Sequence, residues 1–473
     1  MTAACPGATG RYADRPMSTL RRFEPESFRT FRVVDREYDA AERRVTLRYA
    51  LDDEVVFTET LTFELATGDL PEPSGAGFDR ALLHLHVAAG TSYYKTAAPP
   101  EVLVEGEQLT EAELAFHHHL YDDGLREFAV TNGLPVPRSV TVISGGTIGA
   151  SVQGPSVALG NNLRPGLVVP IGGGKDSMVL IEAVRHRRPR LFAVNPHPLV
   201  LELAEEAGLE LLVVRRRLDP GLAELHRSGA LNGHVPVTAI VSLIASVGAF
   251  VHGYDTIAMA VERSASEETV MVDGVPVNHQ YSKSRELELL LAELLSATVS
   301  TDLTYGSGLR PYSELAISKA FAGLTRYHST FCSCNTAFRQ DAGPGDRWCG
   351  NCPKCRFVGL MLAPFVGRET LTAIIGKDLF DDPDQVSGFA ALMSDADKPF
   401  ECVGERRESA VAMRMLAGMP EWRDSVVVVS LASVASALVT DHDVDDLLRP
   451  QDDLAFADPA VAADVDALLM GRR

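Results

Sequence analysis

Residues 167–177 read LVVPIGGGKDS, and this stretch decides the fold. The apolar run 167–171 predicts a buried strand, and residues 176–186, after the glycines, have the pattern of a helix. Glycine allows the backbone a positive φ, and the first amides and the dipole of a helix attract anions. The strand, turn and helix therefore predict a phosphate site at Gly172, Gly173 and Gly174.

The turn does not match the Walker A loop or the dinucleotide fingerprint, which need other spacings. It resembles the PP-loop, Ser-Gly-Gly-x-Asp-Ser, of the ATP pyrophosphatases. By this resemblance Gly173 and Gly174 hold the turn, Asp176 is directed to Mg²⁺, and Ser177 donates to phosphate. Gly172 stands where the family usually has serine, which removes one hydroxyl donor. The alternative is a strand-to-helix turn without a ligand, but the Lys-Asp-Ser continuation favours a nucleotide.

Working outward, short apolar runs alternate with helical segments, which is typical of βαβ units around a parallel sheet. Strands are predicted over 191–194, 209–214 and 256–261, and helices over 199–207, 236–251 and 285–295. The order predicts an α/β fold with a doubly wound parallel sheet. Asn195 follows the second strand, where the PP-loop class receives adenine; alternatively it is a simple turn residue.

The rest of the chain flanks this sheet. Residues 1–19 are predicted to be disordered, 20–160 to form a β-rich domain, 161–365 the ATP-binding domain with a cysteine cluster, and 366–473 a helical region. Alternation over 44–49 and 55–63 predicts antiparallel strands, and 111–132 has helical spacing. Helices are also predicted over 356–365, 369–375, 409–416 and 457–469.

Composition limits the function. The 473 residues carry a formal charge of -20, which disfavours a broad nucleic-acid surface. The start does not have the pattern of a secretory signal, and the most apolar runs, 235–251 and 426–439, are shorter than the roughly 20 residues that span a bilayer. We therefore expect a cytoplasmic protein without a membrane or nucleic-acid partner. The sequence does not indicate an oligomeric state.

Five of the seven cysteines fall between residues 332 and 355, which favours metal ligation over disulfides. Cys349, Cys352 and Cys355 form two consecutive Cys-x-x-Cys spacings, and we choose Cys334 as the fourth ligand of a structural zinc. The group resembles the zinc site of 7-cyano-7-deazaguanine synthases, which supports that choice. An iron–sulfur cluster or a redox pair remains an alternative. Cys5 and Cys402 are expected to bind no metal.

Polar clusters follow the later strands, at the edge of an open sheet where ligands bind. They include Glu262-Arg263-Ser264, the run 278–284 (NHQYSKS) and the run 308–314 (GLRPYSE). Polar loops and helix caps are the alternative, and Ser284 is a plausible cap. We predict substrate contacts from the following residues: Arg263, Asn278, His279, Gln280, Tyr281, Lys283 and Arg310.

The whole arrangement resembles the ATP-dependent UDP-MurNAc-L-Ala-L-Glu epimerase family, MurL. The resemblance rests on the glycine turn with its Lys-Asp-Ser, on NGHVPVT at 232–238, on NHQYSKS at 278–284 and on the Cys-x-x-Cys-x-x-Cys segment. GTSYYK at 90–95 and ECVGE at 401–405 add to it. It covers most of the chain and is weakest before residue 20 and after about residue 419.

This resemblance implies inversion of the terminal L-glutamate of UDP-MurNAc-L-Ala-L-Glu to D-glutamate in peptidoglycan synthesis, with ATP going to AMP and pyrophosphate. Adenylating the α-carboxylate would acidify the α-proton, because the enolate no longer forms beside a full negative charge. Lys175 and Asp176 would act on phosphate and Mg²⁺. His234, His279 and Lys283 are candidates for the general base, and the sequence does not choose among them.

Two other functions remain open. One is a PP-loop enzyme of nucleobase or tRNA modification, such as a 7-cyano-7-deazaguanine synthase; the charge of -20 counts against a tRNA substrate. The other is a non-catalytic nucleotide sensor, which would bind ATP without releasing pyrophosphate.

Overall fold

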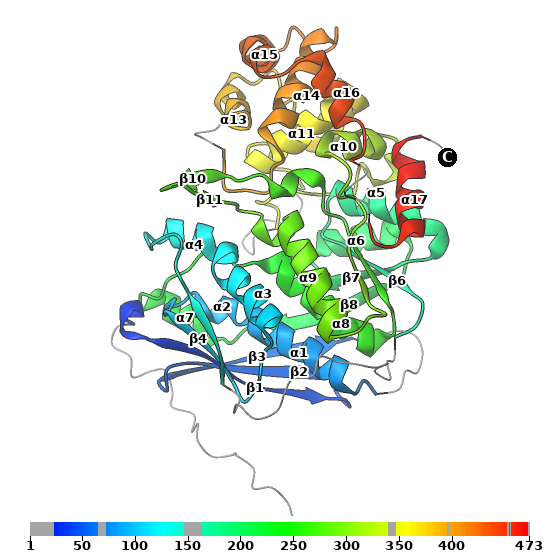
Figure 1. Cartoon of the computed structure of the whole chain (residues 1–473). Coiled ribbons are helices and arrows are strands. Elements are labelled where there is room, and N and C mark those ends of the chain that lie inside the picture. Colours follow the sequence, from blue (N-terminus) through cyan, green and yellow to red (C-terminus); the bar gives the residue numbers. More distant parts are fainter. Residues whose placement is uncertain are drawn as a thin grey trace, which may run out of the picture.

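The computed structural model describes residues 23–64, 72–145, 163–338, 347–394, 398–451, 454 and 456–471. The predicted disordered segment 1–19 and Cys5 lie outside the described residues. The fold is mixed α/β, with one large, mostly parallel sheet and many helices (Figure 1).

The large sheet has ten strands in the order β12-β9-β6-β7-β8-β3-β2-β1-β4-β5. Five of them, from β12 to β8, are parallel to one another. The strand bounds are β1 (Thr30–Asp39), β2 (Arg44–Leu51), β3 (Val55–Phe63), β4 (Glu101–Glu105), β5 (Thr141–Gly145), β6 (Leu167–Pro170), β7 (Arg190–Val194), β8 (Leu211–Arg217), β9 (Thr256–Met259) and β12 (Thr304–Ser307). A separate hairpin contains β10 (Val270–Val272) and β11 (Val275–Val277).

Both faces of the parallel half are covered. Val168 of β6 belongs to the hydrophobic cluster that includes α8 (Val237–His252), whereas its neighbour Val169 belongs to the cluster that includes α5 (Lys175–Val184). Ile257 and Ala258 of β9 divide in the same way. Because successive side chains of a strand point to opposite faces, this division confirms apolar layers on both sides of the sheet.

The parallel strands stand in the order β8-β7-β6-β9-β12. The chain adds β7 and β8 on one side of β6 and then β9 and β12 on the other side, so the switch point of the sheet lies between β6 and β9. Ligands of open α/β sheets bind at the carboxyl ends of the strands beside such a switch point. The glycine turn follows β6 directly, and Glu262 and Arg263 follow β9. The fold therefore brings the predicted phosphate turn and one predicted substrate cluster to the same edge.

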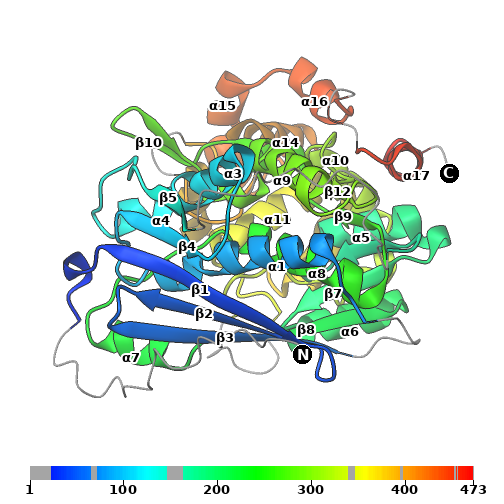
Figure 2. The same cartoon turned by 60° about the horizontal axis from the view of Figure 1, so that its bottom comes forward.

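The N-terminal strands continue the same sheet. Strands β2 and β3 are antiparallel, as predicted, and β1, which the sequence did not single out, pairs antiparallel with β2. Strand β3 lies beside β8 (Figure 2) and pairs antiparallel with it, with Phe63 opposite Val214. The sheet is thus continuous across residue 160, where the sequence suggested a domain boundary. Helix α1 (Ala76–Ala89), which the sequence did not predict, packs against α8 and helps to cover this half.

The predicted helix over 111–132 is interrupted. Helix α3 (Glu111–Tyr121) ends before Asp122, a short 3₁₀ turn follows, and α4 (Arg126–Thr131) continues. The Asp122 carboxylate accepts a hydrogen bond from the backbone N–H of Arg138 at 2.9 Å, and Gly124 lies in the turn. Aspartate and glycine also have low helix propensity. The hydrogen bond between Asp122 and Arg138 and the low propensity of these residues together end the helix at this point.

The predicted helices after the first strand of the parallel sheet and in the C-terminal region are confirmed, with small shifts at their ends. Their bounds are α2 (Thr91–Tyr94), α6 (Pro198–Ala207), α7 (Gly221–Arg227), α9 (Arg285–Thr298), α10 (Glu314–Ala322), α11 (Pro353–Val366), α12 (Arg368–Ile375), α13 (Val386–Ala391), α14 (Arg406–Gly418), α15 (Val426–Leu438), α16 (Asp441–Leu447) and α17 (Pro459–Leu469). The 3₁₀ helices are η2 (Pro25–Ser27), η3 (Asp123–Leu125), η4 (Arg185–Arg187), η5 (Arg263–Ser266), η6 (Tyr281–Lys283), η7 (Thr325–Tyr327) and η8 (Pro383–Gln385). Helices α13 to α16 gather at the end of the molecule opposite β1, β2 and β3 (Figure 1).

Candidate functional site

The glycine turn is shaped for close approach of a ligand. Gly173 has a φ of +93°, and a Cβ there would lie 3.2 Å from the Phe338 ring and 3.3 Å from the Cys332 carbonyl oxygen. The Gly173 carbonyl in turn accepts a hydrogen bond from the Cys332 N–H at 2.9 Å. Gly174 caps α5, whose first amide groups therefore open onto the turn. The chain after residue 330 thus holds the turn in place.

Lys175 and Asp176 begin α5 and enter a charged cluster. The buried Lys175 ammonium pairs with the carboxylates of Asp176 and Glu314. Burial lowers the pKa of Lys175, but these two carboxylates outweigh burial and raise it above the ordinary value. Lys175 is therefore a fixed positive charge beneath the turn.

Three carboxylates come together here from three separate strand ends. One carboxylate oxygen from each of Asp176, Glu262 and Glu314 lies within 4.8 Å of the other two. Burial, and then the charge of Asp176, raise the pKa of Glu314 to about 7. Hard oxygen ligands of this kind suit a divalent cation such as Mg²⁺. The sequence predicted Asp176 for this role, whereas Glu262 and Glu314 stood only within polar clusters.

Ser177 and Asn195 are less directly placed for a ligand. The Ser177 hydroxyl donates to the Gly174 carbonyl at 3.1 Å, within its own helix turn. The Asn195 amide donates to the Arg216 carbonyl at 2.7 Å and accepts from the Arg216 N–H at 2.9 Å. These contacts join the ends of β7 and β8 and match the turn role that the sequence left open for Asn195.

The two arginines that the sequence predicted to contact substrate, Arg263 and Arg310, differ in whether their guanidinium groups have hydrogen-bond partners. Arg310 is buried, and its guanidinium donates to the Glu288 carboxylate and to the carbonyls of Glu262 and Lys283. The Arg310 guanidinium thus holds together the two segments that contain Glu262 and Lys283. Arg263 is also buried, yet neither of its terminal nitrogens has a hydrogen-bond partner among the described residues. Two buried guanidinium nitrogens without a hydrogen-bond acceptor indicate a place for an anionic ligand.

The segment 278–284 folds into a turn and η6. Asn278 accepts from the Gln280 N–H at 2.7 Å and donates to the Ala265 carbonyl at 3.0 Å, which fixes the turn. The Tyr281 hydroxyl lies 3.4 Å from Nδ1 of His119. Ser284 accepts from the Leu287 N–H at 3.2 Å, so its predicted role as a helix cap is confirmed.

His234 and His279 meet, although 45 residues separate them in the numbering. Their ring centroids are 4.8 Å apart, and Nδ1 of each faces the same Glu127 oxygen, at 3.5 Å and 2.5 Å respectively. Burial lowers the pKa of His234 to about 4. Burial acts in the same direction on His279, but hydrogen bonds to Cys402 and Glu127 outweigh it and raise the pKa of His279 to about 9.

Lys283 and Cys402 extend this cluster. Nζ of Lys283 lies 3.5 Å from the Cys402 sulfur and 3.5 Å from Oε1 of Gln280. Cys402 comes from the segment before α14, and Gln280 donates to the Val403 carbonyl of that segment at 3.2 Å. Sequence reasoning set Cys402 aside because it lies outside the cysteine spacing, although the motif ECVGE contains it. No motif in the sequence pointed to Glu127.

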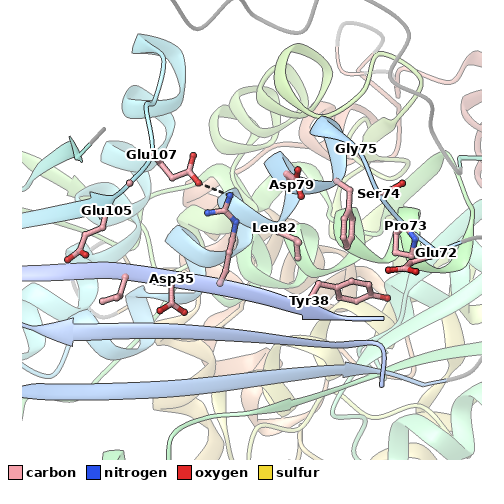
Figure 3. A pocket seen from close by; sticks show the side chains of 14 residues that line it. Asp35, Tyr38, Glu72, Pro73, Ser74, Gly75, Asp79, Leu82, Glu105 and Glu107 are labelled. Atoms are coloured by element: carbon pink, nitrogen blue, oxygen red, sulfur yellow. Dashed lines mark ion pairs between the residues drawn. The ribbon is translucent and has the colours of Figure 1, made fainter. Parts of the chain in front are cut away.

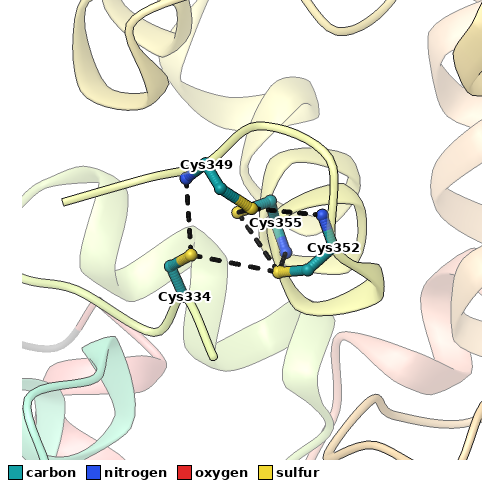
Figure 4. Close-up of side chains that lie close together, drawn as sticks. All are labelled: Cys334, Cys349, Cys352 and Cys355. Atoms are coloured by element: carbon teal, nitrogen blue, oxygen red, sulfur yellow. Dashed lines mark hydrogen bonds between the residues drawn. The ribbon is translucent and has the colours of Figure 1, made fainter. Parts of the chain in front are cut away.

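The four cysteines predicted for zinc come together at the start of α11, which contains Cys355, while Cys334 comes from the segment 331–338 (Figure 4). The sulfurs of Cys334 and Cys352 are 4.0 Å apart, those of Cys349 and Cys355 3.8 Å, and those of Cys352 and Cys355 3.5 Å. Four sulfurs around one zinc at about 2.3 Å would stand roughly 3.8 Å apart. The spacing therefore fits a single metal ion better than a multi-iron cluster.

A cavity of about 620 Å³ lies elsewhere, between β1 and the N-terminal end of α1 (Figure 3). It is lined by acidic side chains such as Asp35, Glu72 and Glu105, and Arg36 pairs with Glu107 at 2.8 Å. None of the described residues that the sequence predicted for the site lines this cavity. The chemistry gathers at the strand ends instead.

Within the described residues, no single helix is both long and apolar enough to cross a membrane. One pair of helices, α15 and α16, passes that test only when joined across a bend of 85°.

A family model described as the MurL N-terminal domain matches residues 22–308, and one described as the MurL C-terminal domain matches residues 330–445. A relative from Micromonospora sp. is 41% identical over 88% of this chain and 92% of its own. Relatives from Xanthomonas oryzae pv. oryzae and Salinispora tropica are 40% and 41% identical over 86% and 88% of this chain, and 90% of theirs. No solved structure matches the chain.

Proposed function

This chain belongs to the MurL family, and from that membership we propose that it inverts the terminal L-glutamate of UDP-MurNAc-L-Ala-L-Glu to D-glutamate. The three relatives carry the name UDP-N-acetyl-alpha-D-muramoyl-L-alanyl-L-glutamate epimerase. High identity over most of both chains supports carrying that activity to this protein. The reaction supplies the D-glutamate of a peptidoglycan precursor.

We further propose that ATP is a substrate and that the enzyme splits it to AMP and pyrophosphate. An ionised carboxylate makes its own α-proton hard to remove, because the enolate would place a second negative charge beside the first. Adenylation of the α-carboxylate removes that charge, and nearby donors can then stabilise the enolate. ATP is thus consumed to acidify a carbon.

The observation that carries this proposal is the carboxylate cluster under the glycine turn. Asp176, Glu262 and Glu314 would hold Mg²⁺, and Lys175 beneath them would meet phosphate charge. Arg263, whose two terminal nitrogens have no hydrogen-bond partner among the described residues, follows β9 at the same edge and would take a carboxylate or phosphate of the substrate. These groups match what transfer of an adenylyl group to a carboxylate requires, which is a cation and fixed positive charge.

We assign the four cysteines to a structural zinc. Residues 331–338 contact Gly173 on one side and supply Cys334 on the other, so a zinc there would hold the glycine turn. Lys354, between two of the cysteines, donates to the Cys402 carbonyl. The zinc would therefore organise both ends of the site without taking part in the reaction.

The test is to incubate the protein with ATP, Mg²⁺ and UDP-MurNAc-L-Ala-L-Glu, then measure AMP, pyrophosphate and the chirality of glutamate after acid hydrolysis. We expect D-glutamate and AMP together, and neither without ATP. The absence of D-glutamate would exclude the epimerase. AMP release with a different acid, without inversion, would leave only a PP-loop enzyme of another specificity, and ATP binding without AMP would indicate a sensor.

The variant Asp176→Asn tests the site within the same assay. Because it removes a carboxylate from the proposed Mg²⁺ site, AMP formation should fall by at least about 100-fold in protein that is still folded, as thermal unfolding checks. Asp424→Asn is the matched control, since the Asp424 side chain is 86% exposed and far along the chain from the site. Equal AMP formation by the two variants would show that the glycine turn is wrongly assigned.

A further inference from the structure

The Cys402 sulfur is held where two parts of the chain meet. The segment 401–405 lies against the turn 278–283, through the hydrogen bond from Gln280 to the Val403 carbonyl at 3.2 Å. On its other side, Lys354 at the start of α11 donates to the Cys402 carbonyl. The two contacts fix the backbone of Cys402 beside Lys283, whose Nζ is 3.5 Å from the sulfur.

Three cationic groups from two segments act on this sulfur: His279 and Lys283 of the turn 278–283, and Lys354 of α11. Burial alone would raise the pKa of the Cys402 thiol. The Lys283 charge, the hydrogen bond from His279 and the Lys354 charge outweigh burial and lower it to about 6. At neutral pH the side chain is therefore a thiolate, which is the reactive form of cysteine.

The other titratable groups of the cluster are poor proton acceptors at neutral pH. His279 carries a proton, because its pKa is raised to about 9 through Cys402 and Glu127. The charge of Cys402, more than the opposing effect of burial, raises the pKa of Lys283 above its ordinary value, so Lys283 is an ammonium ion. His234 is neutral, but its Nδ1 faces Glu127 at 3.5 Å. The Glu127 carboxylate is held by the two histidine rings, His279 at 2.5 Å and His234 at 3.5 Å, which leaves the Cys402 sulfur as the anionic base.

Cys402 is also near the glycine turn. Lys283 and Lys354 act electrostatically on both the Cys402 sulfur and Asp176. Arg263, whose buried terminal nitrogens have no partner among the described residues, interacts with Glu405, three positions after Cys402. A carboxylate activated at the turn and an anion held by Arg263 would thus lie beside the thiolate.

We propose that the Cys402 sulfur is the base that removes the α-proton of the activated glutamyl residue, a role that rests on the proposed epimerase function. The C–H bond breaks, an S–H bond forms, and the electron pair of the C–H bond moves into the enolate of the acyl-adenylate. The enolate carbon then takes a proton from water on the opposite face. The hydroxide left behind takes the proton of the Cys402 thiol, which restores the thiolate and a water molecule. Lys283 and His279 are positioning residues that keep the sulfur ionised.

The experiment is to run the reaction in D₂O with ATP, Mg²⁺ and UDP-MurNAc-L-Ala-L-Glu, and to measure AMP and deuterium at the α-carbon of glutamate by mass spectrometry. The wild-type protein should give both. For Cys402→Ser, deuterium incorporation and D-glutamate should fall by about 100-fold or more, the usual contribution of a general base, while AMP still forms and L-glutamate returns.

Three results would overturn the role of Cys402. Cys402→Ser could incorporate deuterium at the wild-type rate. It could lose AMP formation in proportion to deuterium while keeping its unfolding temperature, which would place Cys402 in adenylation. The wild-type protein could carry a glutamyl adduct on Cys402 in its intact mass during turnover, which would show nucleophilic attack. A wild-type protein that releases no AMP would instead overturn the proposed function itself.

Alkylation with iodoacetamide tests the thiolate without turnover. Cys402 should react with a midpoint near pH 6, as read from peptide masses, and Lys283→Met should move that midpoint upward. The wild-type midpoint is the reference for that shift. An equal midpoint in Lys283→Met and in the wild-type protein would contradict the proposal.

Discussion

At the scale of single residues, the sequence predicted best the groups that stand next to one another in a motif. Asp176 and Lys175 were found because they follow the glycines directly. Glu262, Glu314 and Glu127 join the same site from other strand ends and another helix, and their meeting depends on the strand order, which the sequence leaves open. Cys402 lies 119 positions from Lys283, so no spacing rule could pair them.

The glycine turn offers a matched pair of substitutions. A Cβ at Gly172 meets nothing within 4 Å, so Gly172→Ser, which restores the serine typical of PP-loops, should change the unfolding free energy by less than about 0.5 kcal/mol. Gly173→Ala places a Cβ against Phe338 at a φ of +93°, and should cost about 1–3 kcal/mol and most of the AMP formation.

Chemical unfolding and an AMP assay on both variants check this prediction. If Gly173→Ala were as stable and active as Gly172→Ser, the positive φ at Gly173 would not be needed for the site.

At the scale of elements, the strands and most helices followed from periodicity, and the exceptions have tertiary causes. The helix predicted over 111–132 ends at Asp122 because that carboxylate bonds to the Arg138 backbone across a loop. Helix α1 lies in the region 20–160, which the sequence predicts to be β-rich, and its packing against α8 stabilises it there. The gathering of the four cysteines was predictable, because their Cys-x-x-Cys spacing is visible in the sequence.

The four cysteines give a prediction about metal content. The protein as purified should contain one zinc per chain and show no visible absorption, and Cys349→Ser should lose the zinc, the stability that it provides and the AMP activity that depends on a fixed Gly173. Elemental analysis and thermal unfolding measure the first two effects.

Cys332→Ser is the control variant. The Cys332 sulfur lies 2.8 Å from the Arg347 carbonyl and outside the group of four, so its replacement should leave the zinc content unchanged. Iron with acid-labile sulfide, or loss of zinc from Cys332→Ser, would show that the ligand set is wrong.

At the scale of the whole molecule, one sheet unites parts that the sequence separated. The pairing of β3 with β8 makes the N-terminal strands an extension of the parallel sheet. A strand carries no local signal for the strand with which it pairs, so periodicity could not reveal the pairing of β3 with β8. The candidate site lies between the regions of the two family matches, because Glu127, His279 and Lys283 belong to the first and Cys402 to the second.

The whole molecule should also lose stability in acid, owing to buried neutral histidines. Burial lowers the pKa of His86 to about 3 and that of His252 to about 4. Above pH 6.5 such a histidine is neutral in both the folded and the unfolded chain, so it does not make the free energy of unfolding depend on pH. Below that pH the unfolded chain takes up a proton that the folded chain does not, so each group removes about 1.4 kcal/mol of stability per pH unit until its folded pKa is reached.

Urea unfolding between pH 7 and pH 4.5 measures this loss. His86→Gln should make the fall shallower by about 1.4 kcal/mol per pH unit, whatever its effect at pH 7, whereas exposed His442→Gln should leave the slope as it was. Parallel slopes for wild type and His86→Gln would mean that His86 is protonated in the folded state.

The central claim is that the glutamyl α-carboxylate is adenylated before its α-carbon is inverted. The most direct measurement uses UDP-MurNAc-L-Ala-L-Glu labelled with ¹⁸O in that carboxylate, followed by mass spectrometry of the nucleotide products. Attack of the carboxylate on the α-phosphate and later hydrolysis at the acyl carbon would place one labelled oxygen in AMP and none in pyrophosphate. D-glutamate formed together with AMP that contains no label would contradict the account.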